Sequence, residues 1–532
     1  MSLPIESPEP RQYLAADLAL SIQALSVPYD WLVPGDRVTA SVALANVGNQ
    51  AAFGEFDLNI GVAGIADDAP LEIYGSRRYA LNLAPGATAL YRNITVTIGT
   101  DFTPGLHNFF AEAFIPDDSN NPIADDDLSN NFQFSTRDVE LVYRFGTYQG
   151  DSRSNSRSNV KLITLAEEPL VGGDTAQQTI TYSLTGGGYG EFSSIDGSLT
   201  LSNTGPRSSF SIGVKGGSGV ALVGGPITIN GSLKSFAAPA VDFVNADIRI
   251  AGSLGAFTAR DISSSYLDIG ARASSLKFTA AYVDNLGLFT RTPISSLKVT
   301  SWISADPAED SELPSSDYID APFIASLTSA SSFEPLLFLN GLNAPKGIAL
   351  GKALIRGDVA GLWTVAGNAA SISIGSASTA FEATFAGTLS SFTSLGNFSG
   401  GLSAFSIGKL DFRSDVIGAG IASGYFLGED LSFGGEGSEA DIVPTGSAFG
   451  AIASLTVRGG IYESLISAGL SSADGETFAF APGQSAAIRK LSVSIEVVNS
   501  AFYGLTFPRT VKVGSMTLVP AEHADVFISV LS

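Results

Sequence analysis

The chain has 532 residues, no cysteine, and 29 basic against 52 acidic residues, which gives a formal net charge of −23. Its 45% hydrophobic content excludes a disordered chain, and its acidity repels phosphate backbones and anionic membranes, so we expect no nucleic-acid partner. The absence of cysteine excludes disulfides, thiol nucleophiles and cysteine metal sites.

Residues 1–16 are expected to form an N-terminal leader segment. They lack the basic and apolar regions of a secretory signal, so export would need a replaced leader or another route. The stretch from Pro8 to Leu14 resembles the Leu-Glu-Pro-Arg-x-Leu-Leu segment near the N-terminus of large exported proteins of planctomycetes and related bacteria. Pro8 and Tyr13 stand where that segment has leucines.

Residues 17–138 show short runs of alternating apolar and polar residues separated by turns. Val38 to Leu44 is a clear example, with Pro34-Gly35-Asp36 before it and Asn46-Val47-Gly48 after it. Alternation of period two with turns every 8 to 12 residues is typical of an antiparallel sandwich. The sequence therefore predicts an immunoglobulin-like β-sandwich.

Five landmarks of this stretch occur in the order known from one family: Asp17-Leu18, Pro34-Gly35-Asp36, Asn46-Val47-Gly48, Ala84-Pro85-Gly86 and the closing Asn130-Asn131. The stretch resembles a CARDB domain, an immunoglobulin-like, adhesion-related module of bacterial and archaeal surface proteins. The resemblance implies a cell-adhesion role and an Ig-like fold.

The loop that closes the sandwich carries the best cation candidates of the sequence. Calcium takes six to eight oxygen ligands, which Asp and Asn side chains supply from loops. The candidate ligands are Asp117, Asp118, Asp125, Asp126 and Asp127. The alternative is a solvated acidic hairpin whose side chains serve its own turns, since the ligand order of an EF-hand is absent.

Residues 139–159 are expected to be a linker. They begin as a strand and pass into a run of Ser, Asn and Arg between Gly150 and Asn159, which offers no apolar side chain for packing.

Residues 160–532 are rich in Gly, Ser and Ala and carry a recurring Ser-Leu phrase. Its leucines fall at Leu233, Leu254, Leu276 and Leu297, a period of about 21 to 22 residues. Alternating runs of four to six residues recur, whereas helical periodicity is never sustained. A unit of this size cannot bury its apolar face alone, but stacked copies can, so the sequence predicts a parallel β-helix, a solenoid of repeats.

The phrase from Ala453 to Gly469 resembles the degenerate β-helical repeats of giant exported planctomycete proteins. This resemblance implies architecture and habitat: an extracellular or cell-surface location in a bacterium. No apolar run reaches the roughly 18 residues that cross a bilayer, so we expect no direct membrane insertion.

Side chains for hydrolysis are scarce, and we expect no enzyme. The two histidines, His107 and His523, are interpreted as structural. The acidic cluster from Asp306 to Glu312 lies in a proline-bearing insertion that ends at Asp317 and Asp320. This insertion is interpreted as a solvated loop because no basic residue lies within the cluster.

The sequence therefore indicates an all-β, secreted structural and adhesive protein. Its partners would be other cell-surface components, polysaccharide or copies of itself. The alternative is a carbohydrate-active β-helix, either a polysaccharide lyase or a hydrolase, or a carbohydrate-binding protein. Residues 524–532 stay apolar and strand-like, which predicts an uncovered edge that pairs head to tail with another chain and forms a filament. In the alternative, this strand closes its own rod.

Overall fold

The structure is a computed structural model. It describes residues 15–29, 31–65, 71–99, 102–116, 123, 125, 127–148, 157–169, 175–193, 197–270, 275–304, 317–424, 450–472, 478–480, 487–503, 508 and 511–518. The chain divides into two compact units, Met1–Ser183 and Leu184–Ser532. The all-β class is confirmed: strands dominate the described residues, which include two short 3-10 helices and no α-helix. No helix in these residues is long and apolar enough to cross a membrane.

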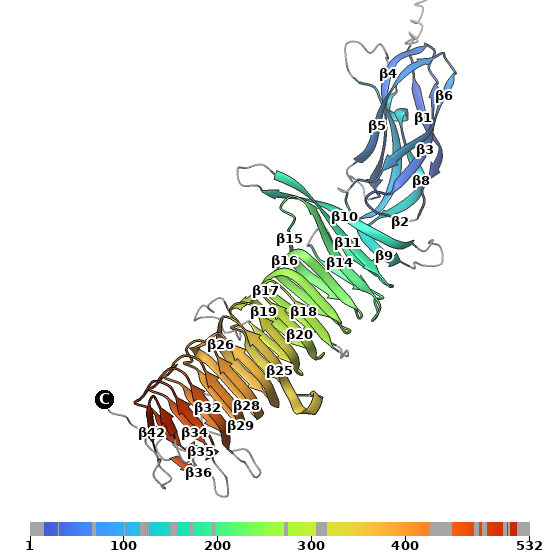
Figure 1. Ribbon diagram of the computed structural model, residues 1–532. Helices are drawn as coiled ribbons and strands as arrows, with labels where there is room; N and C mark the ends of the chain where they lie inside the picture. Colours follow the sequence, from blue (N-terminus) through green and yellow to red (C-terminus); the bar gives the residue numbers. More distant parts are fainter. Residues whose placement is uncertain are drawn as a thin grey trace, which may run out of the picture. The chain divides into compact units, whose positions relative to one another are not determined.

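The first unit, blue to teal in Figure 1, contains two sheets. One has the order β1-β3-β6 and the other the order β2-β8-β7-β4-β5. All pairs in these sheets are antiparallel except β2 with β8. The elements of the unit are β1 (Leu18–Ser26), β2 (Trp31–Leu32), β3 (Arg37–Asn46), β4 (Ala52–Gly64), β5 (Leu71–Leu83), β6 (Thr88–Thr97), β7 (Gly105–Phe114), η1 (Leu128–Asn131), β8 (Phe132–Leu141), β9 (Arg144–Tyr148), β10 (Arg157–Pro169) and β11 (Thr175–Thr185).

The core of the first unit follows the alternation of the sequence. In β3 the side chains of Val38, Val42 and Leu44 are fully buried while Thr39 and Ser41 are partly exposed. The rings of Phe56 and Phe110 are also fully buried. Strand pairing therefore places every second side chain of β3 in the core, as a period of two requires.

The strands of the second unit are β12 (Tyr189–Phe192), β13 (Leu199–Ser202), β14 (Ser209–Gly216), β15 (Ala221–Ile229), β16 (Ser235–Ile250), β17 (Ala256–Ile269), β18 (Leu276–Thr279), β19 (Tyr282–Thr290), β20 (Ile294–Val299), β21 (Ser301–Ile303), β22 (Tyr318–Ala321), β23 (Ile324–Ser329), β24 (Leu336–Leu339), β25 (Ile348–Ile355), β26 (Asp358–Val365), β27 (Asn368–Ile374), β28 (Ser376–Ser394), β29 (Gly401–Phe412), β30 (Val416–Ile417), β31 (Gly420–Ser423), β32 (Ala451–Val457), β33 (Ile461–Tyr462), β34 (Leu465–Ala468), β35 (Leu470–Ser472), β36 (Phe478–Phe480), β37 (Ala487–Ile488), β38 (Leu491–Val493), β39 (Val497–Val498), β40 (Ala501–Tyr503), β41 (Val511–Val513) and β42 (Met516–Leu518). A single turn of 3-10 helix, η2 (Pro345–Gly347), precedes β25.

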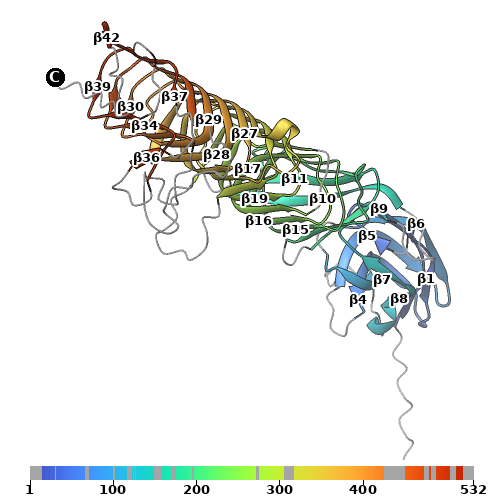
Figure 2. The same ribbon diagram turned by 90° about the horizontal axis from the view of Figure 1, so that it is seen from below.

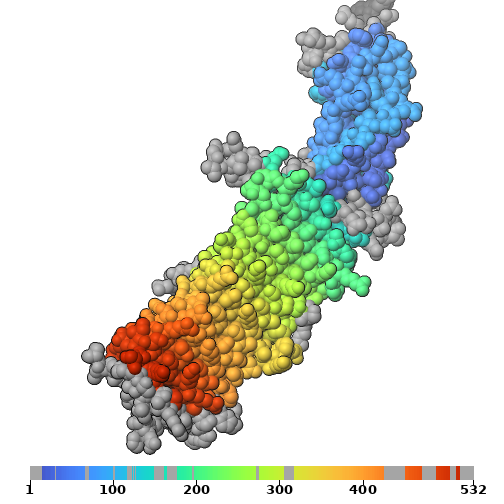
Figure 3. Space-filling view, in the orientation of Figure 1, coloured from blue at the N-terminus to red at the C-terminus, as the bar shows by residue number. Residues whose placement is uncertain are grey.

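From β13 onward, most pairs are parallel and join a strand to its counterpart about one repeat later. Phe236 of β16 pairs with Phe257 of β17, which pairs with Phe278 of β18, which pairs with Leu297 of β20. Figure 2 shows these successive turns of chain as a stack, and the colour bands of Figure 3 cross the surface of this unit turn by turn. Each turn thus hydrogen-bonds to the next one.

Inward-facing aromatic rings form a continuous column in this stack. The ring centroids of Phe236 and Phe257 lie 5.2 Å apart, and those of Phe257 and Phe278 lie 5.4 Å apart. The column continues through Trp302 and Phe333, whose centroids lie 5.9 Å apart, and all five side chains are buried. Such pairs add about 0.5–1.5 kcal/mol each to the free energy of area burial.

The bends between strand segments also recur at matching positions. Asn245, Ser264 and Asn285 follow residues that pair with one another, and all three have positive φ, of 54°, 46° and 52°. A single left-handed residue turns an extended chain, and Asn tolerates this conformation better than most residues. The repeat is therefore encoded in its corners as well as in its apolar positions.

Candidate metal centre

The structure describes two of the five predicted cation ligands, Asp125 and Asp127. Asp117, Asp118 and Asp126 lie outside the described residues. Asp125 forms an isolated bridge with Ala16, and Asp127 immediately precedes η1. The prediction of a calcium site can therefore be followed on these two carboxylates and their neighbours.

Asp127 serves the local turn. Its Oδ1 accepts hydrogen bonds from the Ser129 backbone N–H at 3.0 Å and from the Ser129 hydroxyl at 2.5 Å, which caps η1. These hydrogen bonds lower the pKa of the Asp127 carboxyl. This geometry is the turn-forming role that the alternative interpretation assigns to the loop.

Asp125 lies deeper. Its Oδ2 accepts a hydrogen bond from Asn131 Nδ2 at 2.8 Å, and its Oδ1 accepts long ones from the backbone N–H groups of Leu18 at 3.4 Å and Asp127 at 3.3 Å. Burial raises the pKa of this carboxyl; the three hydrogen bonds oppose that shift, and the negative charge of Asp17 adds to it. Asp125 is thus a partly desolvated carboxylate with a second carboxylate close by.

Asp17 is held by the Asn46-Val47-Gly48 turn. The Asn46 side chain is completely buried; its Nδ2 donates to the carbonyls of Gln50 and Leu83, and its Oδ1 accepts from the Gly48 N–H at 3.1 Å. A Cβ on Gly48 would lie 2.5 Å from the Asp17 nitrogen, so only glycine lets the opening segment pack there.

The paired asparagines connect the two carboxylates. Asn130 Nδ2 donates to Asp17 Oδ1 at 2.7 Å, while Asn131 Nδ2 donates to Asp125 Oδ2. The Oδ1 atoms of both asparagines are buried and have no hydrogen-bond partner in the described part of the chain. Asn131 is 3% exposed, so an unsatisfied carbonyl there is costly.

Rotation of either amide by 180° would turn its carbonyl oxygen toward a carboxylate, which is favourable only with a cation between them. Two carboxylates and two amide oxygens are hard ligands of the kind calcium takes. In the described residues, no cluster of three or more His, Asp or Glu side chains could hold a metal ion. A cation here would thus be held by Asp17, Asp125, Asn130 and Asn131.

Sequence reasoning did not include Asp17, Asn130 and Asn131 among the ligands. The available signal was their position as the first and last landmarks of the stretch, which the strand pairing brings together.

His107 is buried, and its Nδ1 lies 2.9 Å from the Gly105 carbonyl oxygen within the same strand. His523 and the cluster from Asp306 to Glu312 lie outside the described residues. The interpretation of Asp317 as the end of a solvated loop is wrong, because this side chain is 1% exposed and accepts a hydrogen bond from the Trp302 indole N–H. It belongs to the start of the next turn of chain, one residue before β22.

No protein-family model matches the chain, and no curated protein matches it. Among solved structures, the CARDB domain of a Pyrococcus furiosus protein in complex with di-metal ions is 15% identical, over 24% of this chain and 96% of that domain, with a TM-score of 0.16. A Listeria innocua β-glucosidase in complex with glucose is also 15% identical, over 24% of this chain, with a TM-score of 0.16. The chain covers 16% of the length of that glucosidase. A sporulation control protein from Bacillus subtilis is 12% identical, over 33% of this chain and 77% of its own, again with a TM-score of 0.16. Similarities at this level carry no argument for function.

Proposed function

We propose that the chain is an extracellular structural and adhesive protein of a bacterial surface. An Ig-like β-sandwich of the CARDB type, residues 17–138, precedes a linker at 139–159 and a parallel β-helix at 160–532. The sandwich is the adhesive part, and the β-helix is a rigid support that displays it. The protein is not an enzyme, and its partners are surface components, polysaccharide or further copies of the chain.

The observation that carries this proposal is the parallel ladder of the second unit. Residue-to-residue pairing runs from β15 through β16, β17 and β19, and in the later turns from β29 through β32 to β38. In a stacked repeat each turn contacts only its neighbours, so the stack can lengthen turn by turn without a new core. A chain that devotes most of its length to such a ladder is suited to spacing and support.

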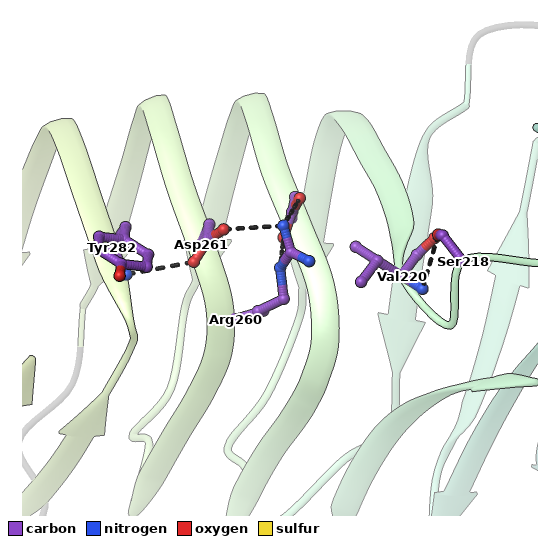
Figure 4. Close-up of polar contacts among 6 residues, drawn as sticks. Ser218, Val220, Arg260, Asp261 and Tyr282 are labelled. Carbon is purple, nitrogen blue, oxygen red and sulfur yellow. Dashed lines mark hydrogen bonds and ion pairs between the residues drawn. The ribbon is translucent and has the colours of Figure 1, made fainter. Parts of the chain in front are cut away.

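The outer surface reinforces the stack. Arg260 of β17 donates two hydrogen bonds to the Asp242 carboxylate of β16, at 2.7 and 2.9 Å, and its Nη2 lies 3.0 Å from Asp261 Oδ2. Asp261 Oδ1 in turn accepts a hydrogen bond from the Tyr282 backbone N–H of β19 at 3.2 Å. Figure 4 shows this chain of contacts passing from turn to turn. Stacked Asp242 and Asp261 would repel each other without the arginine.

Two measurements test the proposal. Antibodies against the second unit should label intact cells of the source organism as strongly as permeabilised cells; labelling that requires permeabilisation would contradict a surface location. The purified chain should release neither reducing ends nor unsaturated products from a panel of neutral and acidic polysaccharides. Release of either product would overturn the non-enzymatic function and favour the carbohydrate-active alternative.

The filament hypothesis rests on residues 524–532, which lie outside the described residues. It stays a prediction. Light scattering over a concentration series, with deletion of these residues as the control, tests it: a chain that remains monomeric at high concentration refutes it.

A further inference from the structure

Four successive turns of the second unit line an open cavity of about 550 Å³ on its surface. Each turn contributes the residues where a strand ends: Gly270 after β17, Phe289 to Arg291 at the end of β19, Pro322 after β22, and Asn340 after β24. Residues Pro322 and Phe323 alone join β22 to β23, whereas η2 and its flanking residues, 340–347, join β24 to β25. The short connection beside the long one leaves the hollow.

The polar side chains of this cavity form no ion pair or hydrogen bond with one another among the described contacts. Burial raises the pKa of the Asp320 carboxyl, and no basic side chain of the described residues opposes that shift. Arg291 is exposed and makes no ion pair with another described residue. Asn340 Oδ1 accepts a hydrogen bond from the Leu342 N–H, which fixes the amide with its N–H groups left to donate. The cavity therefore offers an acceptor and two sets of donors.

Aromatic side chains lie along the same face because of the register. Asp268, Phe289, Asp320 and Phe338 pair in succession and so form one outward-facing column. The column two residues earlier contains Tyr266, Gly287 and Tyr318. Glycine between the two tyrosines leaves room for a hydrogen bond between Tyr266 and Tyr318. Burial, and after it this hydrogen bond, raises the pKa of Tyr266 to about 12.

We propose that this cavity and the aromatic column beside it bind a neutral glycan. The Phe289 ring packs against the apolar face of a sugar ring, Asp320 accepts hydrogen bonds from sugar hydroxyls, and Arg291 and Asn340 donate to sugar oxygens. Concave sites with an apolar wall and a few convergent polar groups are the usual form of small-ligand sites.

The charged side chains beside the cavity favour a neutral glycan over an acidic one. Asp268 and Asp320 stand in the column itself, and one oxygen of Asp268 is buried with no hydrogen-bond partner in the described part of the chain. Arg249, at the start of the column, is paired with Asp247 at 2.8 Å. An acidic polysaccharide would therefore lie against two carboxylates and only one arginine that makes no ion pair with a described residue. The net charge of the chain, −23, repels it further.

The test is affinity electrophoresis of the full chain in gels that contain a neutral glucan, xylan or mannan, with polygalacturonate as the anionic comparison. At least one neutral polymer should retard the protein. Phe289→Ala should weaken that retardation at least tenfold, and Asp320→Asn and Arg291→Gln several-fold. The matched control is Tyr282→Ala, which removes an exposed ring from the same strand at a distance from the cavity and should change nothing.

The proposal is overturned if no neutral polymer retards the chain, if Phe289→Ala and Tyr282→Ala behave alike, or if polygalacturonate alone retards it. Thermal melts of each variant exclude loss through unfolding. Failure here leaves the structural function untouched, because that function is judged by cell labelling and by product release. Conversely, product release with intact retardation would refute the non-enzymatic function and keep the glycan site.

Discussion

Asp317 offers a sharp test of the energetics of the stack. It is a carboxyl group 1% exposed between two turns of chain. Its Oδ1 accepts hydrogen bonds from the Trp302 indole N–H at 2.5 Å and from the Leu286 backbone N–H at 3.3 Å. Burial nevertheless dominates and raises the pKa of Asp317 from 3.8 to about 6. The folded state therefore disfavours the charged carboxylate.

The direction of the pH dependence follows from this shift. Well below pH 3.8 the carboxyl is protonated in both the folded and the unfolded chain, and no penalty arises. As the pH rises from 3.8 to about 6, the unfolded chain loses its proton while the folded chain keeps it, so the second unit loses stability, and the loss is complete above about pH 6. A shift of this size corresponds to about 3 kcal/mol at pH 7. Asp317→Asn, which keeps an acceptor for both N–H groups and cannot ionise, should recover much of this free energy.

We expect Asp317→Asn to raise the melting temperature at pH 7 by a few degrees and to leave it nearly unchanged at about pH 3, below the unfolded pKa of 3.8. Tryptophan fluorescence, to which Trp302 and Trp363 of the second unit contribute, follows the transition, and protection of the Leu286 amide from hydrogen exchange should increase. The control is Asp247→Asn, an exposed carboxylate whose loss should change stability by less than about 1 kcal/mol. A variant that is destabilised at pH 7 would refute the reasoning. In that case the hydrogen bonds from the two N–H groups to a charged carboxylate would stabilise the folded state by more than the burial of the charge costs.

Three further predictions concern the first unit and the aromatic column. Calcium should stabilise the first unit by about 2.7 kcal/mol at a hundredfold excess over its Kd, and Asp125→Asn should abolish that gain; superimposed melts with calcium and with chelator would leave the loop without a cation. Gly48→Ala should lower the stability of the first unit by more than 1 kcal/mol, measured in urea, because its Cβ would clash with the Asp17 backbone; an unchanged midpoint would mean that the opening segment docks independently. Phe257→Ala should cost about 3–5 kcal/mol and reduce exchange protection in β16 and β18 more than in β32, whereas a uniform loss would show that the stack unfolds as one body.

The all-β class and the stacking of the second unit could be predicted from the sequence because both follow from local periodicity. Alternation places side chains on two faces, and the repeat interval brings like positions together. The recurring phrase itself was a less faithful guide than the interval. Leu233 and Leu254 do pair, but Leu276 pairs with Ile294, and it is Phe278 that pairs with Leu297. The inward-facing positions repeat from turn to turn. Where a corner gains or loses a residue, the Ser-Leu phrase moves out of register with these positions.

The candidate sites depend on contacts that no local pattern records. Asp17 and Asn130 meet only because β1 and the segment before β8 close on each other, which joins the first and last landmarks of the stretch. Phe289 and Asp320 are neighbours in register although residues 305–316 separate their turns in the sequence, so their spacing differs from the repeat interval. For the same reason Asp317, which composition assigns to an acidic loop, is in fact a buried residue immediately before β22.

The stack also explains why the proposed glycan site and the proposed support role can coexist in one unit. The inward columns are close-packed and tolerate little change, since each ring contacts those above and below it. Outward side chains are less constrained: apart from contacts such as Arg260 with Asp242, the register fixes only which of them lie side by side, about 4.8 Å apart. Substitutions at Phe289 or Asp320 therefore test recognition with little effect on the ladder, whereas substitutions at Phe257 test the ladder itself. A support whose turns are set by its interior leaves its surface free to acquire a ligand.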